Sequence, residues 1–406
     1  MSKGDIIENR YIIKIENIGK GLTSKVSIVE DKETKKYYAI KILKDKFYEQ
    51  NFDIEKEVLQ LLKDKKIPNV INLISSGEFC TEKYLILDLA QKGHLYNFIN
   101  VRPLKETYAK IFFKKILEAV KNLHNNGVYH RDLKTENILL DNKYNPIICD
   151  FGFFTIIKTG LKEHVGSYCY AAPELFDFFD KYNLKPYNGE KVDIFALGVI
   201  LFNLVTGKYA FRFKKKTDPG YKDIYINIKE KNYPSFWKLV SKNINEVKEE
   251  FKELYVKMIA YKPVERPSIE EILADKWLEE INKKSDKEIE DIEAEIYEDF
   301  LERESYLINK KTTIINKENK NNEIKEDTKG GSEDENNDFK YNLIPKKFRE
   351  GKYLEYYNEI IGDLNPVKFM NDLTQKLKEE NENKEREYDC NIEPNEYKLK
   401  FKVTFE

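Results

Sequence analysis

The sequence predicts an α+β protein in which a small β-rich lobe precedes a larger helical lobe. Three segments between residues 11 and 43 are rich in β-branched and aromatic residues and are separated by turn signals. After about residue 104, apolar residues instead recur mostly at helical spacing, with short loops between the segments. The length of 406 residues also favours more than one structural unit, because it corresponds to two or three units of ordinary domain size.

The individual elements follow from local patterns. A helix is predicted over 53–63, with Ile54, Val58, Leu61 and Leu62 on its inner face. The apolar run at 194–205 predicts a buried helix, because it is far shorter than the ~20 residues of a membrane span. Strands are predicted at 11–15, 26–30, 37–43 and 84–89.

The tail after the helical lobe divides into three predicted parts. Residues 280–308 should form an acidic amphipathic helix, in which Ile289, Ile292, Ile296 and Phe300 make one apolar stripe. Three roles stay open for this helix: packing on its own lobe, dimerising as a coiled coil, or inhibiting the lobe. The Lys-, Asn- and Glu-rich segment 309–340 predicts a disordered linker, and 341–406 predicts a small α+β unit.

Composition and charge exclude several classes of protein. Hydrophobic residues make up 41% of the chain, which excludes wholesale disorder, and the net charge of −2 argues against nucleic acid as a partner. Residues 1–279 sum to +8 and 280–406 to −10, so the tail is acidic and no calmodulin site, which is a basic helix, is expected. The four cysteines have no paired spacing, and no apolar leader follows Met1, so we expect reduced thiols in a cytoplasmic protein.

Five short motifs follow one another along the chain. They are GKGLTSKV at 19–26 between two predicted strands, AIK at 39–41, HRDLKTEN at 130–137, DFG at 150–152 and APE at 172–174. The first is a weak signal by itself, because a plain turn uses the same residues. Order and spacing together carry the argument, since an unrelated fold has no reason to combine all five.

With these motifs, residues 11–279 resemble the eukaryotic protein kinase family, which implies a bilobal protein kinase fold. The DLK arrangement at 132–134 resembles the Ser/Thr type, as does Ser167 in the usual Ser/Thr position of the substrate loop. Segments 84–87 and 93–95 look like the calcium/calmodulin-dependent-kinase-like group. The Lys, Asn and Ile usage also resembles the expanded kinase sets of ciliates.

The resemblance implies roles in phosphoryl transfer, which is mostly positioning and charge neutralisation. Asp132 would be the catalytic base, and Lys134 would neutralise the transferring phosphoryl group. Asn137 and Asp150 would hold Mg²⁺ through oxygen atoms. Lys41 would bind the α- and β-phosphates of ATP.

Lys41 needs a carboxylate from the following helix to hold it. Glu55 and Glu57 are both candidates. We favour Glu57, because its distance from Pro68 and Asn69 fits the family with one inserted residue.

The resemblance also implies a nucleotide pocket. Backbone N–H groups of a glycine-rich loop can approach phosphates closely, while apolar residues and the hinge enclose adenine. Ser24 stands where the family usually has glycine, which predicts altered nucleotide affinity without loss of binding. The implied set is Gly19, Lys20, Gly21, Ser24, Val26, Ala39, Lys41, Asp88, Ala90 and Leu139.

Other matched positions imply structural or regulatory roles. Asp193 would anchor the catalytic loop, and Glu174 would pair with Arg266 inside the large lobe. Glu163 stands where related kinases often carry a phosphorylatable Thr. We hypothesise that it partly replaces a phosphate against Arg131, with an ordinary solvated charge as an equal alternative.

The sequence therefore predicts an active serine/threonine protein kinase that uses ATP and Mg²⁺ on protein substrates. The alternative is a pseudokinase that serves as a binding scaffold, but all four residues of the phosphate-, metal- and proton-handling set are present. A small-molecule kinase is disfavoured by segment 166–174, which resembles a protein-substrate docking loop. The protein substrate, the upstream activator and the oligomeric state are not predicted.

Overall fold

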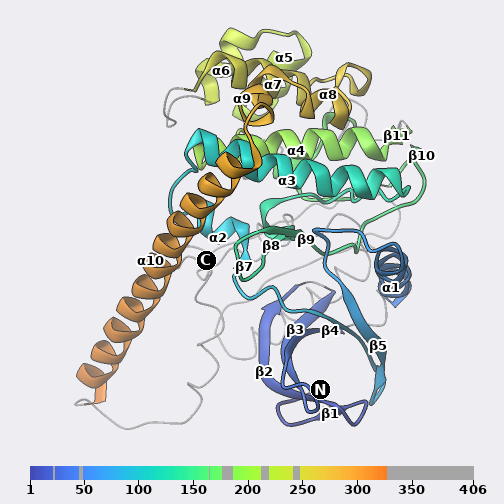
Figure 1. Ribbon diagram of the computed structural model, residues 1–406, viewed down its shortest axis with the longest axis vertical. Helices are drawn as coiled ribbons and strands as arrows, with labels where there is room; N and C mark the ends of the chain where they lie inside the picture. The colour runs from blue at the N-terminus through green and yellow to red at the C-terminus, as the bar shows by residue number, and fades with distance from the viewer. Residues whose placement is uncertain are drawn as a thin grey trace, which may run out of the picture.

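The computed structural model describes residues 1–21, 23–44, 49–163, 165–175, 186–211, 219–240 and 247–326. This part of the chain forms a small lobe built on a sheet, a larger helical lobe, and a long helix that lies along the outside of the larger lobe (Figure 1). The predicted α+β architecture with two lobes is confirmed.

The small lobe is a six-stranded antiparallel sheet with strand order β1-β2-β3-β4-β6-β5. Alternate residues face its core, among them Val29, Ile40 and Ile42, which are fully buried. One helix, α1 (Glu49–Asp64), accompanies the sheet. The strands are β1 (Ile6–Ile7), β2 (Tyr11–Lys20), β3 (Ser24–Asp31), β4 (Tyr37–Leu43), β5 (Leu73–Phe79) and β6 (Glu82–Asp88).

Helix α1 exists as predicted, and its inner face matches the prediction in part. Its buried residues are Phe52, Glu55, Val58, Leu59 and Leu62, at spacings of three and four. Ile54, which the sequence places on the inner face, is exposed. The helix is confirmed, and so is the inward position of Val58 and Leu62, but the placement of Ile54 on the inner face is wrong.

The large lobe packs helices around α4 (Gly189–Thr206), which is buried along almost its whole length. This confirms the buried helix predicted at 194–205. Its remaining helices are α2 (Leu95–Ile99), α3 (Glu106–Asn125), α5 (Pro219–Lys229), α6 (Tyr233–Val240), α7 (Glu249–Met258), α8 (Ile269–Leu273) and α9 (Lys276–Asn282). Short strands complete it: β7 (Gly93–His94), β8 (Ile138–Leu140), β9 (Pro146–Ile148), β10 (Thr159–Leu161) and β11 (Tyr187–Asn188).

The long outer helix, α10 (Asp286–Glu326), differs from the predicted tail. Helix α9 ends at Asn282, and a new helix starts after Ser285, whose hydroxyl bonds with Glu288. Helix α10 then continues beyond residue 308 into the segment predicted as a linker, so that predicted helix end is wrong. Residues 327–340 and the predicted α+β unit at 341–406 lie outside the described residues. Within the described part, no helix has the length and hydropathy of a bilayer span.

Candidate active site

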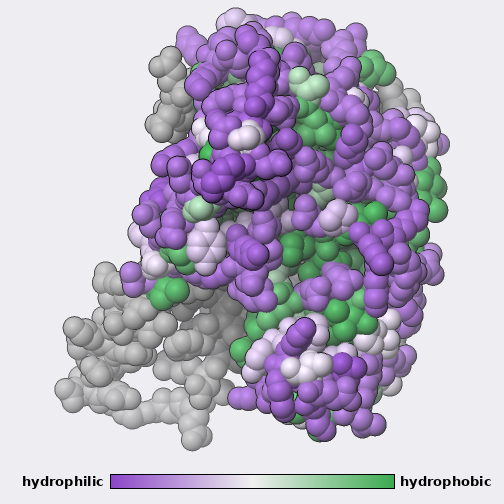
Figure 2. All heavy atoms as spheres, in the orientation of Figure 1, coloured by the Kyte–Doolittle hydropathy of each residue, from purple (hydrophilic) through white to green (hydrophobic). Residues whose placement is uncertain are grey.

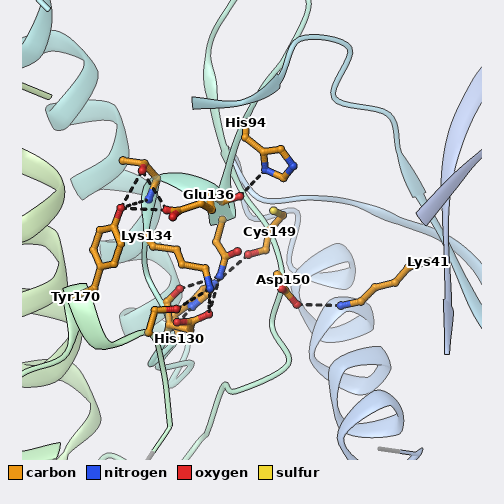
Figure 3. Close-up of polar contacts among 12 residues, drawn as sticks. Lys41, His94, His130, Lys134, Glu136, Cys149, Asp150 and Tyr170 are labelled. Atoms are coloured by element: carbon orange, nitrogen blue, oxygen red, sulfur yellow. Dashed lines mark hydrogen bonds and ion pairs between the residues drawn. The ribbon is translucent and has the colours of Figure 1, made fainter. Parts of the chain in front are cut away.

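A buried lysine joins the two lobes. Lys41 on β4 places its Nζ 2.7 Å from both carboxylate oxygens of Glu55 on α1 and 2.9 Å from Oδ1 of Asp150 in the large lobe. Figure 3 shows Lys41 and Asp150 pointing toward one another. Glu57 is exposed, so the preference for Glu57 over Glu55 is wrong.

This cluster holds one cation against two carboxylates. Burial alone would lower the pKa of Lys41, but Asp150 and Glu55 together raise it above its ordinary value. Lys41 in turn is the main reason why the pKa of Asp150 lies below its ordinary value. Because the Asp150 side chain is half exposed, the surplus negative charge is open to a ligand.

A buried carboxylate on helix α4 anchors the loop that carries Asp132. Asp193 on α4 accepts hydrogen bonds from the backbone N–H groups of His130 and Arg131, both at 2.8 Å, and it also contacts His124 at 2.9 Å. Arg131 has a φ of +63°, a conformation that costs free energy for a side-chain-bearing residue. The two bonds to Asp193 offset that cost and confirm its predicted anchoring contact.

Asp132 lies at the centre of the loop. Its Oδ2 accepts hydrogen bonds from Lys134 Nζ at 2.7 Å and from Asn137 Nδ2 at 3.0 Å. Its Oδ1 is buried and has no hydrogen-bond partner within the described part of the chain. Lys134 also donates to Ser167 Oγ at 2.8 Å, so Asp132, Lys134 and Ser167 form one cluster.

A glycine makes this cluster possible. Gly166 has a φ of +97°, and a Cβ atom there would lie 2.6 Å from the carbonyl oxygen of Arg131. Only glycine lets the two loops approach this closely. The approach brings Ser167, the next residue, against Lys134.

The two predicted metal ligands end neighbouring segments. Asn137 directly precedes β8, and Asp150 follows β9 by two residues. Cys149 donates its backbone N–H to the carbonyl of Asn137 at 3.0 Å, which holds the two segments together. Asn137 and Asp150 therefore lie at the same, open end of the β8–β9 hairpin.

The predicted nucleotide-binding residues come from both lobes. In the small lobe, Gly19 pairs with Val26 and Lys20 with Lys25 across β2 and β3, and the N–H of Gly21 donates to the carbonyl of Ser24. The half-buried apolar residues are Val26, Ala39 and Leu139; the hinge residue Asp88 ends β6, and Ala90 follows it. Figure 2 shows apolar side chains gathered in the band between the lobes.

Arg131 ties the segment after Asp150 to the catalytic loop. Its guanidinium donates to the Glu163 carboxylate at 2.9 Å, to the Tyr187 hydroxyl at 3.0 Å and to the carbonyl of Phe153 at 2.7 Å. The Tyr187 hydroxyl also donates to the Glu163 carbonyl at 2.9 Å. Arg131 and Glu163, which the sequence links by hypothesis, are in contact.

Comparison with known proteins agrees with this geometry. The family described as "Protein kinase domain" matches residues 12–278. The chain belongs to the protein kinase family. Its β-rich small lobe and helical large lobe are those of the protein kinase fold.

Several serine/threonine kinases are similar to this chain. The probable serine/threonine-protein kinase MARK-B of Dictyostelium discoideum is 36% identical, over 71% of this chain and 38% of that protein. The human NUAK family SNF1-like kinase 1 is 37% identical, over 50% of this chain and 31% of its own length. The carbon catabolite-derepressing protein kinase of Secale cereale is 31% identical, over 68% and 52%. The chain thus matches about a third to a half of each relative.

The kinase domain also contains the predicted internal ion pair. Arg266 NH1 and NH2 lie 2.6 and 2.7 Å from the two carboxylate oxygens of Glu174. Backbone carbonyls accept its remaining hydrogen bonds, among them that of Ala260 at 2.9 Å. The predicted contact is confirmed.

Sequence reasoning missed a group of hydroxyls beside the catalytic loop. The Tyr170 hydroxyl contacts Glu136 Oε2 at 3.0 Å (Figure 3). It also contacts Thr135 Oγ1 at 2.9 Å and the Tyr209 hydroxyl at 3.2 Å. Burial is the main reason why the pKa of Tyr170 is far above its ordinary value. Tyrosine residues form no local sequence pattern that would predict these contacts.

Proposed function

We propose that this chain is an active serine/threonine protein kinase, which transfers the γ-phosphoryl group of ATP to protein hydroxyls. The observation that supports it most directly is the buried, unpartnered Oδ1 of Asp132 among the described residues. A buried acceptor without a donor costs about 1–3 kcal/mol, so a water molecule or a ligand is expected to donate to it. The hydroxyl of a Ser or Thr substrate supplies the missing donor.

The transfer follows from this placement. The substrate oxygen forms a bond to the γ-phosphorus while the bond from that phosphorus to the β–γ bridging oxygen breaks, and ADP leaves. The hydroxyl proton passes to the Asp132 carboxylate. Lys134 neutralises charge on the phosphoryl group, and Lys41 binds the α- and β-phosphates.

The residues present fit Mg²⁺. Asn137 donates through its Nδ2 to Asp132, so the Oδ1 of Asn137 is left for a cation. Asp150 offers a half-exposed carboxylate. Mg²⁺ prefers such oxygen ligands and takes the rest of its shell from phosphates and water. When bound, the ion neutralises the phosphate charge of ATP.

We further place this kinase near the calcium/calmodulin-dependent-kinase-like group and in the cytoplasm, acting on protein substrates. The match to kinases named MARK-B and SNF1-like supports the serine/threonine type. The likeness to ciliate kinases stays a prediction. The pseudokinase alternative is disfavoured by the complete set Lys41, Asp132, Asn137 and Asp150.

The decisive experiment incubates the full chain with labelled ATP, Mg²⁺ and a mixed Ser/Thr peptide library. We expect transfer by the wild type and a loss of about 10²–10⁴-fold in Asp132→Asn, because the proton acceptor is removed. Nucleotide binding is measured in both and should stay similar. A wild type that binds ATP and transfers nothing would favour the scaffold.

A further inference from the structure

The first half of α10 is built into the large lobe. The Phe300 ring is fully buried and stacks on Phe112, with ring centres 5.3 Å apart. It also lies 5.3 Å from the rings of Phe98 and Tyr144. Ile296, one turn earlier, is buried as well. Phe300 and Ile296 are thus part of the hydrophobic core of the large lobe.

A buried arginine fixes the direction of the helix. Arg303 is 1% exposed, and its guanidinium donates to the carbonyls of Phe98 and Pro103 at 3.0 Å and to that of Arg102. These carbonyls lie near the end of α2 and in the loop that follows it. Asp299 holds the same guanidinium at 2.6 Å. Arg303 therefore ties α10 to the chain at and after the end of α2.

Glu304 comes next and reaches two segments of the proposed nucleotide site. Lys92 Nζ lies 2.8 and 3.1 Å from its two carboxylate oxygens, and the Tyr144 hydroxyl donates to it at 2.6 Å. Burial alone would raise the pKa of Glu304, but these two hydrogen bonds hold it below its ordinary value. The carboxylate is thus charged and bonded to both partners.

Lys92 and Tyr144 lie on either side of Leu139, one of the apolar residues expected to enclose adenine. Lys92 follows the hinge residue Ala90 by two positions, and its backbone N–H donates to the carbonyl of Leu140. Tyr144 lies in the turn between β8 and β9. Between them, β7 pairs with β8, so that His94 lies opposite Leu139. The Glu304 carboxylate connects the end of the hinge to the hairpin that carries Leu139.

We propose that Glu304 of α10 is a positioning residue for the nucleotide site, which holds the hinge against the β8–β9 hairpin through Lys92 and Tyr144. The proposal rests on the proposed kinase function. Phe300 and Arg303 keep α10 docked independently of Glu304, so removing the charge loosens the hinge contact without releasing the helix. The later turns of α10 extend away from the large lobe (Figure 1).

The test compares Glu304→Gln with Glu302→Gln in the full chain. Glu302 is two residues earlier on the same helix, is 71% exposed and pairs with the exposed Arg102. We measure the Kd of a non-hydrolysable ATP analogue, the KM for ATP, the KM for peptide and kcat, all well below the melting temperature. Glu304→Gln should raise the Kd and the KM for ATP about two- to tenfold, with less than twofold change in kcat and peptide KM. Glu302→Gln should change none of them.

A double-mutant cycle makes the proposal sharper. Lys92→Met should raise the nucleotide Kd as Glu304→Gln does, and the double variant should be no worse than either, because both remove one contact. An unchanged Kd in Glu304→Gln, an equal effect of Glu302→Gln, or full additivity would overturn the proposal. Failure of the kinase function would instead leave a wild type that binds nucleotide without transfer, and the Kd comparison would still decide the role of Glu304.

Discussion

This kinase has two buried ionic contacts, each built on one cation, that differ in the number of carboxylates and in their exposure to solvent. Arg266 meets a single carboxylate, Glu174, and backbone carbonyls accept its other hydrogen bonds, so the pair is neutral and closed. Lys41 meets two carboxylates, Glu55 and Asp150, and the second of these is half exposed. The first pair lies within one lobe, and the second joins both lobes.

The difference separates stability from function. A closed, neutral pair has nothing left to offer a ligand, and its loss leaves one buried charge uncompensated. The cluster at Lys41 has one more carboxylate than cations, so a bound cation can balance its charge. We therefore expect substitution of Arg266 to lower mainly stability and substitution of Lys41 to lower mainly catalysis.

Arg266→Met should have the largest effect, and on stability. It leaves Glu174 without a cation in the interior, which costs about 3–5 kcal/mol. Urea unfolding followed by circular dichroism measures the loss, with Lys283→Met, whose partner Glu279 is also exposed, as the matched control near zero. Equal midpoints for the two variants would contradict a structural role for the pair.

Lys41→Met should instead act mainly on catalysis. Removal of a preorganised charge from the phosphate site lowers kcat by about 10²–10³. The unfolding midpoint should fall less than in Arg266→Met, because Asp150 is half exposed and Glu55 can take up a proton. Labelled-phosphate transfer and urea unfolding on the same preparation decide the matter. A loss of stability as large as that of Arg266→Met would erase the distinction between the pairs.

Glu55→Gln and Glu57→Gln form the next comparison. Both remove one charge from α1 at positions two residues apart, but only Glu55 contacts Lys41. We expect Glu55→Gln to lower kcat/KM for ATP about tenfold, because the neutral amide holds the ammonium group less firmly. Glu57→Gln should match the wild type. A larger loss in Glu57→Gln would restore the contact that the sequence favoured.

The same helix shows where sequence reasoning stops. Short motifs such as HRDLKTEN and DFG can be recognised from the sequence alone. The structure brings Lys41, Asp132, Asn137 and Asp150 together as the resemblance implies. The face of α1 depends on what it packs against. Its apolar residues cover a wide arc, and both Ile54 and Phe52 fit a helical stripe. Tertiary packing selects Phe52, and Glu55 turns inward with it.

Helix α10 was less accessible to sequence analysis for two reasons. Lys and Glu are good helix formers, so a low hydrophobicity argues against burial but not against a helix beyond residue 308. Arg303 stands in an acidic segment, and its hydrogen-bond acceptors are backbone carbonyls about 200 positions earlier in the chain. Carbonyls leave no mark in a sequence, so this contact follows only from the fold.

The smallest expected effect belongs to the contact between Arg131 and Glu163. Arg131 is largely buried but Glu163 is 61% exposed, so water screens the pair and we expect it to contribute about 1 kcal/mol or less. If the pair helps to order the segment after Asp150, Glu163→Ala should lower kcat by about two- to fivefold at low ionic strength. High salt screens exposed charges, so wild-type turnover should then approach that of the variant. Steady-state peptide phosphorylation over a salt series measures both. Equal turnover at low salt would make Glu163 an ordinary surface charge, whereas a loss that salt does not change would point to the shape of the side chain.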